Sequence, residues 1–194
     1  MSDIPKSEQS WSPLETQHLC YKLRRRINSE LLFSFGYSDK HLIKYIAKLT
    51  ESIKDRKERN KRMHDLYEQM SAYSHWLIEA ERDDVASLTR DIARHLRKAN
   101  TIWPTYYSEY CERRVELDRA REACNALEDE LQYLAESLPA DKNRYTSIVL
   151  DVEEIFNKIG ALRSADNRFL DTLPDVPPAV MARREKEKQR NKKK

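Results

Sequence analysis

The chain has 194 residues, of which 36% are charged, 39% are apolar and only two are glycine. Proteins rich in β-structure or phosphate-binding loops need glycine at tight turns and close approaches, so this composition excludes most of them. Ten tyrosines, three tryptophans and a regular Leu/Ile spacing exclude disorder for the middle of the chain. The composition therefore predicts an elongated all-α protein.

The net charge of +3 is distributed unevenly. Residues 183–194 hold eight basic and two acidic residues, so the rest of the chain is slightly acidic. Such a terminus is typical of segments that meet nucleic acid, an acidic protein surface or an anionic membrane. The three cysteines show no C-x-x-C spacing, and the sequence has no signal-peptide core. We therefore expect an intracellular protein of the cytoplasm or nucleus, with the nucleus favoured by the basic tail.

The first part of the chain predicts a short helix that ends at a corner. Residues 1–11 are polar and lack periodicity, so we expect a disordered arm there. The Ser-Pro-Leu-Glu of residues 12–15 is a helix start, because serine caps, proline suits the first helical position and glutamate completes a capping box. Apolar residues then recur at helical spacing over residues 19–35. Gly36 is expected to end this helix and turn the chain.

A long second helix is predicted after this corner. Ser38 is a helix cap, and no proline or glycine follows until after Trp103. We therefore predict one continuous helix over residues 38–100, roughly 90 Å long at 1.5 Å per residue. A break near residues 71–75 or 83–84 is the alternative. Residues 12–100 thus form the predicted N-terminal helical region.

Two heptad seams dominate the C-terminal half, residues 101–173. Their a and d positions are Tyr106, Tyr110, Arg113, Leu117, Ala120, Cys124, Leu127, Leu131, Leu134 and Leu138 in the first, and Tyr145, Ile148, Val152, Ile155, Ile159, Leu162, Asp166, Phe169 and Leu173 in the second. The turn between them, residues 139–143, is short. Two amphipathic helices joined in this way predict an antiparallel coiled-coil hairpin. Since each seam supplies the other's partner, the heptads alone do not require dimerisation.

Each seam carries one charged residue, Arg113 in the first and Asp166 in the second. In an antiparallel hairpin that turns near residue 141, these two positions lie nearly opposite each other. We predict that they pair as a salt bridge that fixes the hairpin register. The combined reversal Arg113→Asp and Asp166→Arg is the corresponding test.

Two basic segments are candidate contacts to phosphate or to an acidic partner. Residues 54–62 contain no apolar residue, and residues 174–194, which begin with a proline-rich stretch, are expected to form a disordered basic tail. The candidate contact residues are Lys54, Arg56, Lys57, Arg59, Lys61, Arg62, Arg183, Arg184, Lys186, Lys188, Arg190, Lys192, Lys193 and Lys194. The alternative interpretation of both segments is a solvated charged stretch. The tail also fits a nuclear localisation signal.

The sequence contains no catalytic or cofactor-binding pattern. None of the five histidines stands in a zinc-site spacing, and two isolated glycines cannot form a nucleotide-binding loop. We therefore expect no enzyme activity, no cofactor and no metal.

The segment Phe35-Gly-Tyr-Ser-Asp39, followed by Leu42, Tyr45, Ile46 and Leu49, resembles the corner between helices in PWI-like domains of splicing factors. The resemblance is confined to residues 35–49, and the charged helix that follows departs from that domain. An ordinary capped turn accounts for the same residues, so no family is assigned.

The favoured function is a non-enzymatic helical scaffold or adaptor subunit of a larger assembly, which acts through coiled-coil and helix-in-groove contacts. The alternative is a nuclear nucleic-acid-associated component, of RNA processing or chromatin, that docks through the basic segments. A BAR-like membrane-binding helical dimer ranks third, because the body of the chain is slightly acidic, and membrane binding is not expected. The expected partners are other protein subunits, nucleic acid at the basic tail, or a second copy of this chain. The partner surface is expected on the N-terminal long helix.

Overall fold

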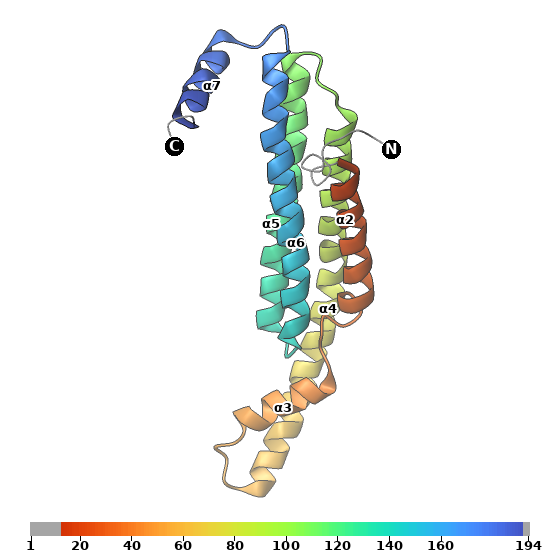
Figure 1. Cartoon of the computed structure of the whole chain (residues 1–194). Helices are drawn as coiled ribbons and strands as arrows, with labels where there is room; N and C mark the ends of the chain where they lie inside the picture. The colour runs from red at the N-terminus through yellow and green to blue at the C-terminus, as the bar shows by residue number, and fades with distance from the viewer. Residues whose placement is uncertain (1–12, 192–194) are drawn as a thin grey trace.

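The protein is an elongated assembly of helices, as the composition predicts (Figure 1). The helices are α2 (Pro13–Arg26), α3 (Asp39–Leu49), α4 (Arg56–Thr101), α5 (Tyr107–Ser137), α6 (Lys142–Ala165) and α7 (Pro178–Asn191). A π-helical turn, η1 (Ile27–Leu31), extends α2, and a 3-10 segment, η2 (Asp166–Asp171), extends α6. This computed structural model describes residues 13–191, and the predicted disordered arm, residues 1–11, lies outside that range. Within it no β-strand occurs beyond one isolated bridge between Tyr37 and Ala140.

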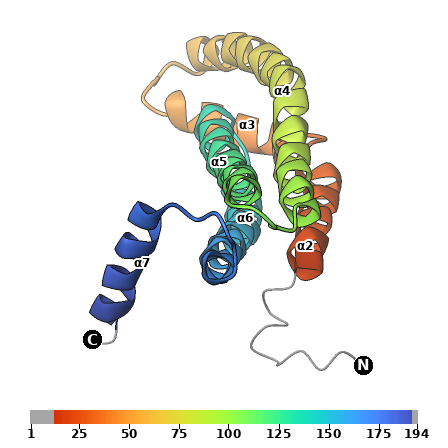
Figure 2. The same ribbon diagram turned by 90° about the horizontal axis from the view of Figure 1, so that it is seen from above.

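Four of the helices, α2, α4, α5 and α6, form a bundle. Each packs against two neighbours, in the order α2, α4, α5, α6 and back to α2. Neighbouring helices run antiparallel, and the end-on view shows the bundle closing around one core (Figures 1 and 2). The predicted N-terminal region and the predicted C-terminal hairpin therefore pack together.

The α5–α6 hairpin supplies half of this bundle. Every seam position of both helices is buried except Tyr106, which is exposed, and Leu173, which is half-buried. Two further residues of α5, Glu116 and Ala123, lie between seam positions and are buried as well. They are buried because α4 packs along that side of α5. The apolar face is thus wider than a two-helix seam, which is typical of a bundle helix.

The predicted continuous helix over residues 38–100 is wrong. The chain leaves the helix after Leu49, turns through residues 50–55 and starts α4 at Arg56. Local hydrogen bonds explain the break: the Thr50 hydroxyl donates to the Ile46 carbonyl at 2.9 Å, and Asp55 caps α4 by accepting from Glu58 N at 2.7 Å. The helix α4 runs without interruption through residues 71–75 and 83–84, so neither of the alternative break points predicted from the sequence ends a helix.

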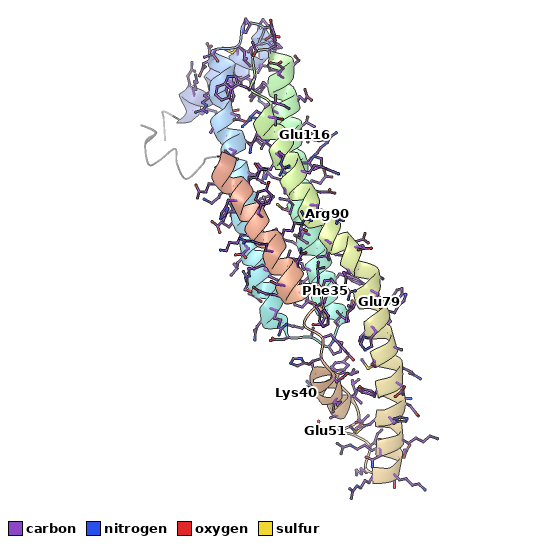
Figure 3. All side chains as sticks on the ribbon, turned by 90° about the vertical axis from the view of Figure 1, so that its right-hand side faces the viewer. Phe35, Lys40, Glu51, Glu79, Arg90 and Glu116 are labelled. Carbon is purple, nitrogen blue, oxygen red and sulfur yellow. The ribbon has the colours of Figure 1, made fainter. Side chains whose placement is uncertain are left out.

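The break makes a hairpin that projects beyond the bundle. This projecting hairpin comprises α3, the turn after it and the first part of α4, residues 39–73 together. It extends from one end of the bundle, with Phe35 at the junction, Lys40 on α3 and Glu51 in the turn after α3 (Figure 3). Leu42 and Ile46 of α3 are buried against α4, so one layer of side chains holds the two helices together.

Residues 178–191 form α7, in contrast to the disordered tail expected from their composition. Apolar contacts explain the helix, because Val176 and Val180 pack on a small cluster that contains Tyr110 and Leu170. Asp171 of η2 adds ion pairs to Arg184 at 2.6 Å and to Lys188 at 3.1 Å. These tertiary contacts stabilise a helix that the sequence of this segment alone does not predict.

Candidate functional site

The projecting hairpin exposes several apolar side chains of α3. Ile43, Tyr45 and Leu49 of α3 have relative exposures of 50%, 46% and 52%. They flank Leu42 and Ile46, the residues that face α4, so the apolar arc of α3 is wider than the face that α4 covers. A helix with uncovered apolar flanks is suited to contact a further helix or peptide.

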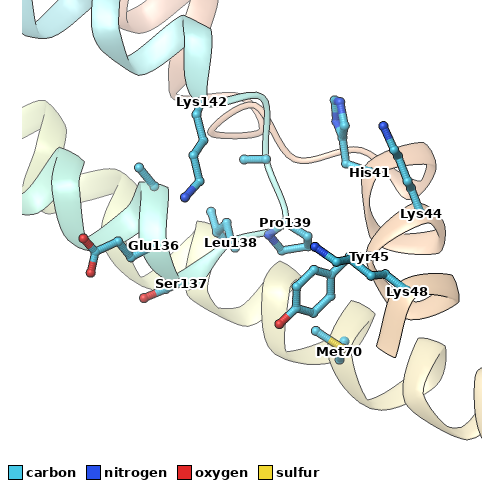
Figure 4. Close-up of a pocket in the computed structure, with 12 residues that line it drawn as sticks. His41, Lys44, Tyr45, Lys48, Met70, Glu136, Ser137, Leu138, Pro139 and Lys142 are labelled. Carbon is cyan, nitrogen blue, oxygen red and sulfur yellow. The ribbon is translucent and has the colours of Figure 1, made fainter. Parts of the chain in front are cut away.

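A cleft of about 350 Å³ opens beside this surface, where α3, α4 and the α5–α6 turn meet (Figure 4). Its apolar walls come from Tyr45 on α3, Met70 on α4, and Leu138 and Pro139 in the turn. Its full lining is His41, Lys44, Tyr45, Lys48, Met70, Ala135, Glu136, Ser137, Leu138, Pro139, Ala140 and Lys142. We refer to this feature as the junction cleft.

The polar rim of the junction cleft is predominantly basic. Lys44 and Lys48 stand on one stripe of α3, and Lys142 belongs to the first turn of α6. Within the described residues none of these three lysines forms an ion pair. Among the lining residues that the structure describes, Glu136 alone is acidic, and its side chain accepts a hydrogen bond from Gln132. The cleft therefore offers three unpaired ammonium groups beside an apolar floor.

The corner at Gly36 positions the two walls of the cleft. Phe35 and Gly36 have φ angles of 45° and 70°, both in the left-handed region, where glycine is favoured. The Phe35 carbonyl accepts from the Tyr145 hydroxyl at 2.6 Å, and the Gly36 carbonyl accepts from Asp141 N at 3.1 Å. These bonds tie the α2–α3 corner to the α5–α6 turn. The predicted corner at Gly36 is present, although the regular helix before it ends earlier, at Leu31.

A small polar cluster fixes the start of α3 on α4. The hydroxyl of Tyr67 donates to Asp39 Oδ1 at 3.0 Å, and the hydroxyl of Tyr37 donates to the same oxygen at 3.2 Å. Burial and the neighbouring Asp39 raise the pKa of Tyr37, which keeps its phenol protonated as a donor. Tyr37 also packs edge-on against His75 with ring centroids 5.4 Å apart. These contacts within the chain therefore fix the orientation of α3 relative to α4.

The first predicted basic segment lies at the tip of the projecting hairpin. Lys54 is in the turn, and the other five candidates, Arg56, Lys57, Arg59, Lys61 and Arg62, are in the opening turns of α4. All are exposed except Arg59, which is half-buried. None of them lines the junction cleft.

The second predicted basic segment lies on α7, at the opposite end of the molecule (Figure 1). Arg183, Arg184, Lys186, Lys188 and Arg190 are within this helix, and two of them pair with Asp171. Lys192, Lys193 and Lys194 lie outside the described residues. The structure therefore does not bring the two basic segments together.

A larger hollow of about 880 Å³ lies between α5 and α7, and arginines line it. Most of these charges are already engaged: Arg163 pairs with Asp118, Arg184 pairs with Asp171, and Arg114 donates to Asn167 Oδ1. The junction cleft differs because its lysines have no such partners among residues 13–191.

Arg113 and Asp166 meet inside the bundle, with Arg113 Nε donating to Asp166 Oδ2 at 2.6 Å. Both side chains are buried. The structure thus brings together the two charged seam residues that the sequence pairs.

Sequence reasoning missed the junction cleft. Its walls come from α3 and from residues 135–142, which are about a hundred positions apart in the chain. One local signal was available: His41, Lys44, Tyr45 and Lys48 recur at spacings of three and four, which places them on one helical face.

Comparisons with known proteins assign no family to this chain. No family model matches it, and neither the curated proteins nor the solved structures provide a match. Within residues 13–191, no helix has the length and apolar character needed to cross a membrane. The same residues contain no group of three or more His, Cys, Asp or Glu side chains placed to hold a metal ion.

Proposed function

We propose that this protein is a non-enzymatic helical scaffold or adaptor subunit that docks a partner protein on its projecting hairpin. The observation that carries the proposal is the exposed apolar flank of α3, formed by Ile43, Tyr45 and Leu49. A partner that covers these side chains removes apolar surface from water, at about 25 cal/mol per Å².

The bundle supports this choice because the heptad seams of α5 and α6 are already paired. The seam residues of α5 and α6 are buried by helices of the same chain, so they leave no seam for another subunit. The hairpin, in contrast, is covered from one side only and stands clear of the bundle (Figure 3). This supports the expectation that the partner surface belongs to residues 38–100, the predicted N-terminal long helix, which include α3.

The double substitution Ile43→Asp and Leu49→Asp tests the proposal. We expect proteins that co-purify with the wild-type chain to be reduced at least tenfold, because two charges are placed in the docking surface. The measurement is quantitative mass spectrometry of affinity-purified complexes, with circular dichroism to verify that the helix content is unchanged.

A matched control is Val115→Asp with Leu150→Asp, on α5 and α6, where the side chains have exposures of 47% and 59%. This variant should retain the partners. If both variants lose the same proteins, or neither loses any, docking on the projecting hairpin is wrong.

A second candidate function is nucleic-acid binding, favoured by the exposed cations at the hairpin tip. Lys57, Lys61 and Arg62 are all exposed there, as phosphate contacts require. Replacing these three by glutamate should abolish binding of a single-stranded RNA or DNA oligonucleotide at 50 mM salt. Wild-type binding should also weaken steeply as salt rises. Salt-independent binding, or no binding by the wild type, rules out this alternative.

Further proposals concern compartment and assembly. The basic residues 183–194 support nuclear residence. The test is a fluorescent fusion from which these residues are deleted, and it should lose nuclear accumulation.

Self-association is tested by light scattering. The BAR-like alternative has less support, because a concave membrane-binding face needs basic residues along several helices, whereas the two basic segments lie at opposite ends of the molecule. Absence of binding to anionic vesicles would exclude the BAR-like alternative.

A further inference from the structure

We infer that the junction cleft binds an acidic segment of a partner protein, which inserts one aliphatic or aromatic side chain between Tyr45, Met70 and Pro139. Carboxylates next to that side chain lie against Lys44, Lys48 and Lys142. The inference rests on the proposed function, since it names the chemistry of a partner that docks on the projecting hairpin.

The size of the cleft selects a short segment. A volume of about 350 Å³ is at the lower end of the range for sites that enclose small ligands. One large apolar side chain and the backbone beside it fit such a space, whereas a folded domain does not. The walls are fixed by the corner hydrogen bonds of Phe35 and Gly36, so the cleft is formed before the partner arrives.

The charges of the rim select an acidic segment. The three lysines are exposed and unpaired within the described residues, and they surround an apolar floor from two sides. Lys142 also lies in the first turn of α6, where the positive end of the helix dipole adds to its charge. The single acidic group of the lining, Glu136, is hydrogen-bonded to Gln132. A basic or neutral segment would leave these ammonium groups without counter-charges.

The apolar floor favours a peptide over a bare phosphate chain. Tyr45, Met70, Leu138 and Pro139 offer contact to a hydrophobic side chain, which a nucleic-acid backbone lacks. Lysines on flexible stems adapt to carboxylates at several positions, whereas the bidentate recognition typical of phosphate sites uses arginine. Among the lining residues that the structure describes, none is arginine.

The test is a selection of random twelve-residue peptides displayed on phage against the full-length protein. Peptides are counter-selected on the triple variant Lys44→Glu, Lys48→Glu and Lys142→Glu. We expect enrichment of sequences in which two or more Asp or Glu residues flank a Leu, Ile, Phe or Trp. A synthetic copy of the enriched peptide should bind at least tenfold more weakly to the triple variant, by fluorescence anisotropy.

Two matched controls separate the cleft from general surface effects. The variant Lys57→Glu, Lys61→Glu and Arg62→Glu makes a charge change of the same size at the tip of the projecting hairpin, outside the cleft, and it should bind the peptide within about twofold of wild type. Tyr45→Ala should weaken binding at least fivefold. Tyr133→Ala, at an equal exposure of 46%, should leave it unchanged.

Four outcomes overturn the inference. These are no enrichment, enrichment of neutral or basic peptides, peptides that bind the triple variant equally well, and tighter binding of single-stranded RNA or phosphatidylserine vesicles than of the peptide through the same lysines. The proposed function is judged separately by the Ile43 and Leu49 variant. If that variant loses cellular partners and the triple variant does not, hairpin docking stands and the acidic segment is wrong.

Discussion

The guanidinium of Arg113 is buried where three segments of the chain meet. Besides its bond to Asp166, its Nη1 donates to the carbonyl oxygens of Ala99 and Ile102, at the end of α4. The Ala99 carbonyl also accepts from Ile102 N, so Arg113 adds a further donor at the helix end while it pairs with η2. The double reversal of Arg113 and Asp166 is therefore a poor test of the pair, because aspartate at position 113 would face two carbonyl oxygens.

A thermodynamic cycle with smaller changes tests the pair better. We expect Arg113→Met to lower the free energy of unfolding by about 3–5 kcal/mol, since it leaves Asp166 buried with its charge unpaired. Asp166→Asn should lower it less, because the amide oxygen still accepts from Arg113. Urea denaturation of both variants and of their combination gives the coupling energy, expected at about 1 kcal/mol or more. Strictly additive losses would contradict a direct pairing.

Glu130 on α5 makes stability depend on pH. Burial, a hydrogen bond to Glu81 of α4 and the charges of Glu81 and Asp84 raise the pKa of Glu130 from 4.5 to about 7. The folded state therefore favours the protonated carboxyl more than the unfolded state does. Its contribution to stability is fully present below pH 4.5 and is lost as the pH rises to about 7.

The substitution Glu130→Gln should keep this contribution at all pH values. At pH 8 we expect a gain of roughly 0.5–1 kcal/mol, because the like charges on α4 and α5 no longer repel. That corresponds to about 1–4 °C in Tm for a protein of this size. At pH 4 the two proteins should melt together. Glu122→Gln, an exposed position on the same helix, is the control, and an equal gain there would exclude the pairing with Glu81 as the cause.

At the scale of single helices, α7 is held by few contacts, the apolar packing of Val180 and the pairs of Asp171 with Arg184 and Lys188. Asp171→Asn should loosen α7 and uncover Cys111, a half-buried thiol whose apolar cluster includes Val180. We expect a thiol reagent to label Cys111 about three to ten times faster, as the loss of two exposed ion pairs implies.

The other two cysteines provide an internal reference for this labelling. Cys20 and Cys124 are buried in the bundle, and burial raises the pKa of Cys20 to about 12, so both should stay unreactive. Asp118→Asn removes an ion pair to Arg163 that does not involve α7 and should not change the labelling rate. Equal acceleration in both variants would show that α7 is not the cover of Cys111.

The helices that the sequence predicted best are those whose signal is local and periodic. The seams of α5 and α6 repeat every seven residues, and almost every seam position is buried. The break after Leu49 was missed because it depends on single hydrogen bonds, one from the Thr50 side chain at the end of α3 and one to the Asp55 side chain at the start of α4. A charged segment with no proline or glycine gives no sign of either bond. The helix α7 was missed because its stability comes from side chains outside the helix, those of α5, which are distant in the chain, and those of η2. The junction cleft was missed for the same reason.

At the scale of the whole molecule, charge follows the architecture. Residues 40–62, most of the projecting hairpin, contain nine basic and three acidic residues, and residues 63–182 contain 14 basic and 23 acidic residues. The basic residues 183–194 follow at the other end. The net charge is thus positive at both ends and negative in the middle. An acidic partner is therefore repelled by the bundle and attracted to an end of the molecule.

The projecting hairpin should be the less stable part of the molecule. In α3 only Leu42 and Ile46 are buried, whereas α5 buries residues along its whole length. We expect amides of α3 to exchange with deuterium roughly a hundredfold faster than those at the centre of α5, as sub-global opening allows. Hydrogen-exchange mass spectrometry measures this. Equal protection of α3 and α5 would mean that the hairpin opens only with the bundle.

The contact between α2 and α6 has a consequence for the order of folding. Arg26 bonds to Ser147 and Asp151, and Arg26 and Asp151 are 125 residues apart in sequence. Closing so long a loop costs roughly 3 kcal/mol more entropy than closing a five-residue turn, so α4, α5 and α6 should associate before α2 docks. Pulse-labelled exchange should then show protection of α5 before α2, and the reverse order would refute this. Since the Gly36 corner follows α2, the walls of the junction cleft would come together only in the last step of folding.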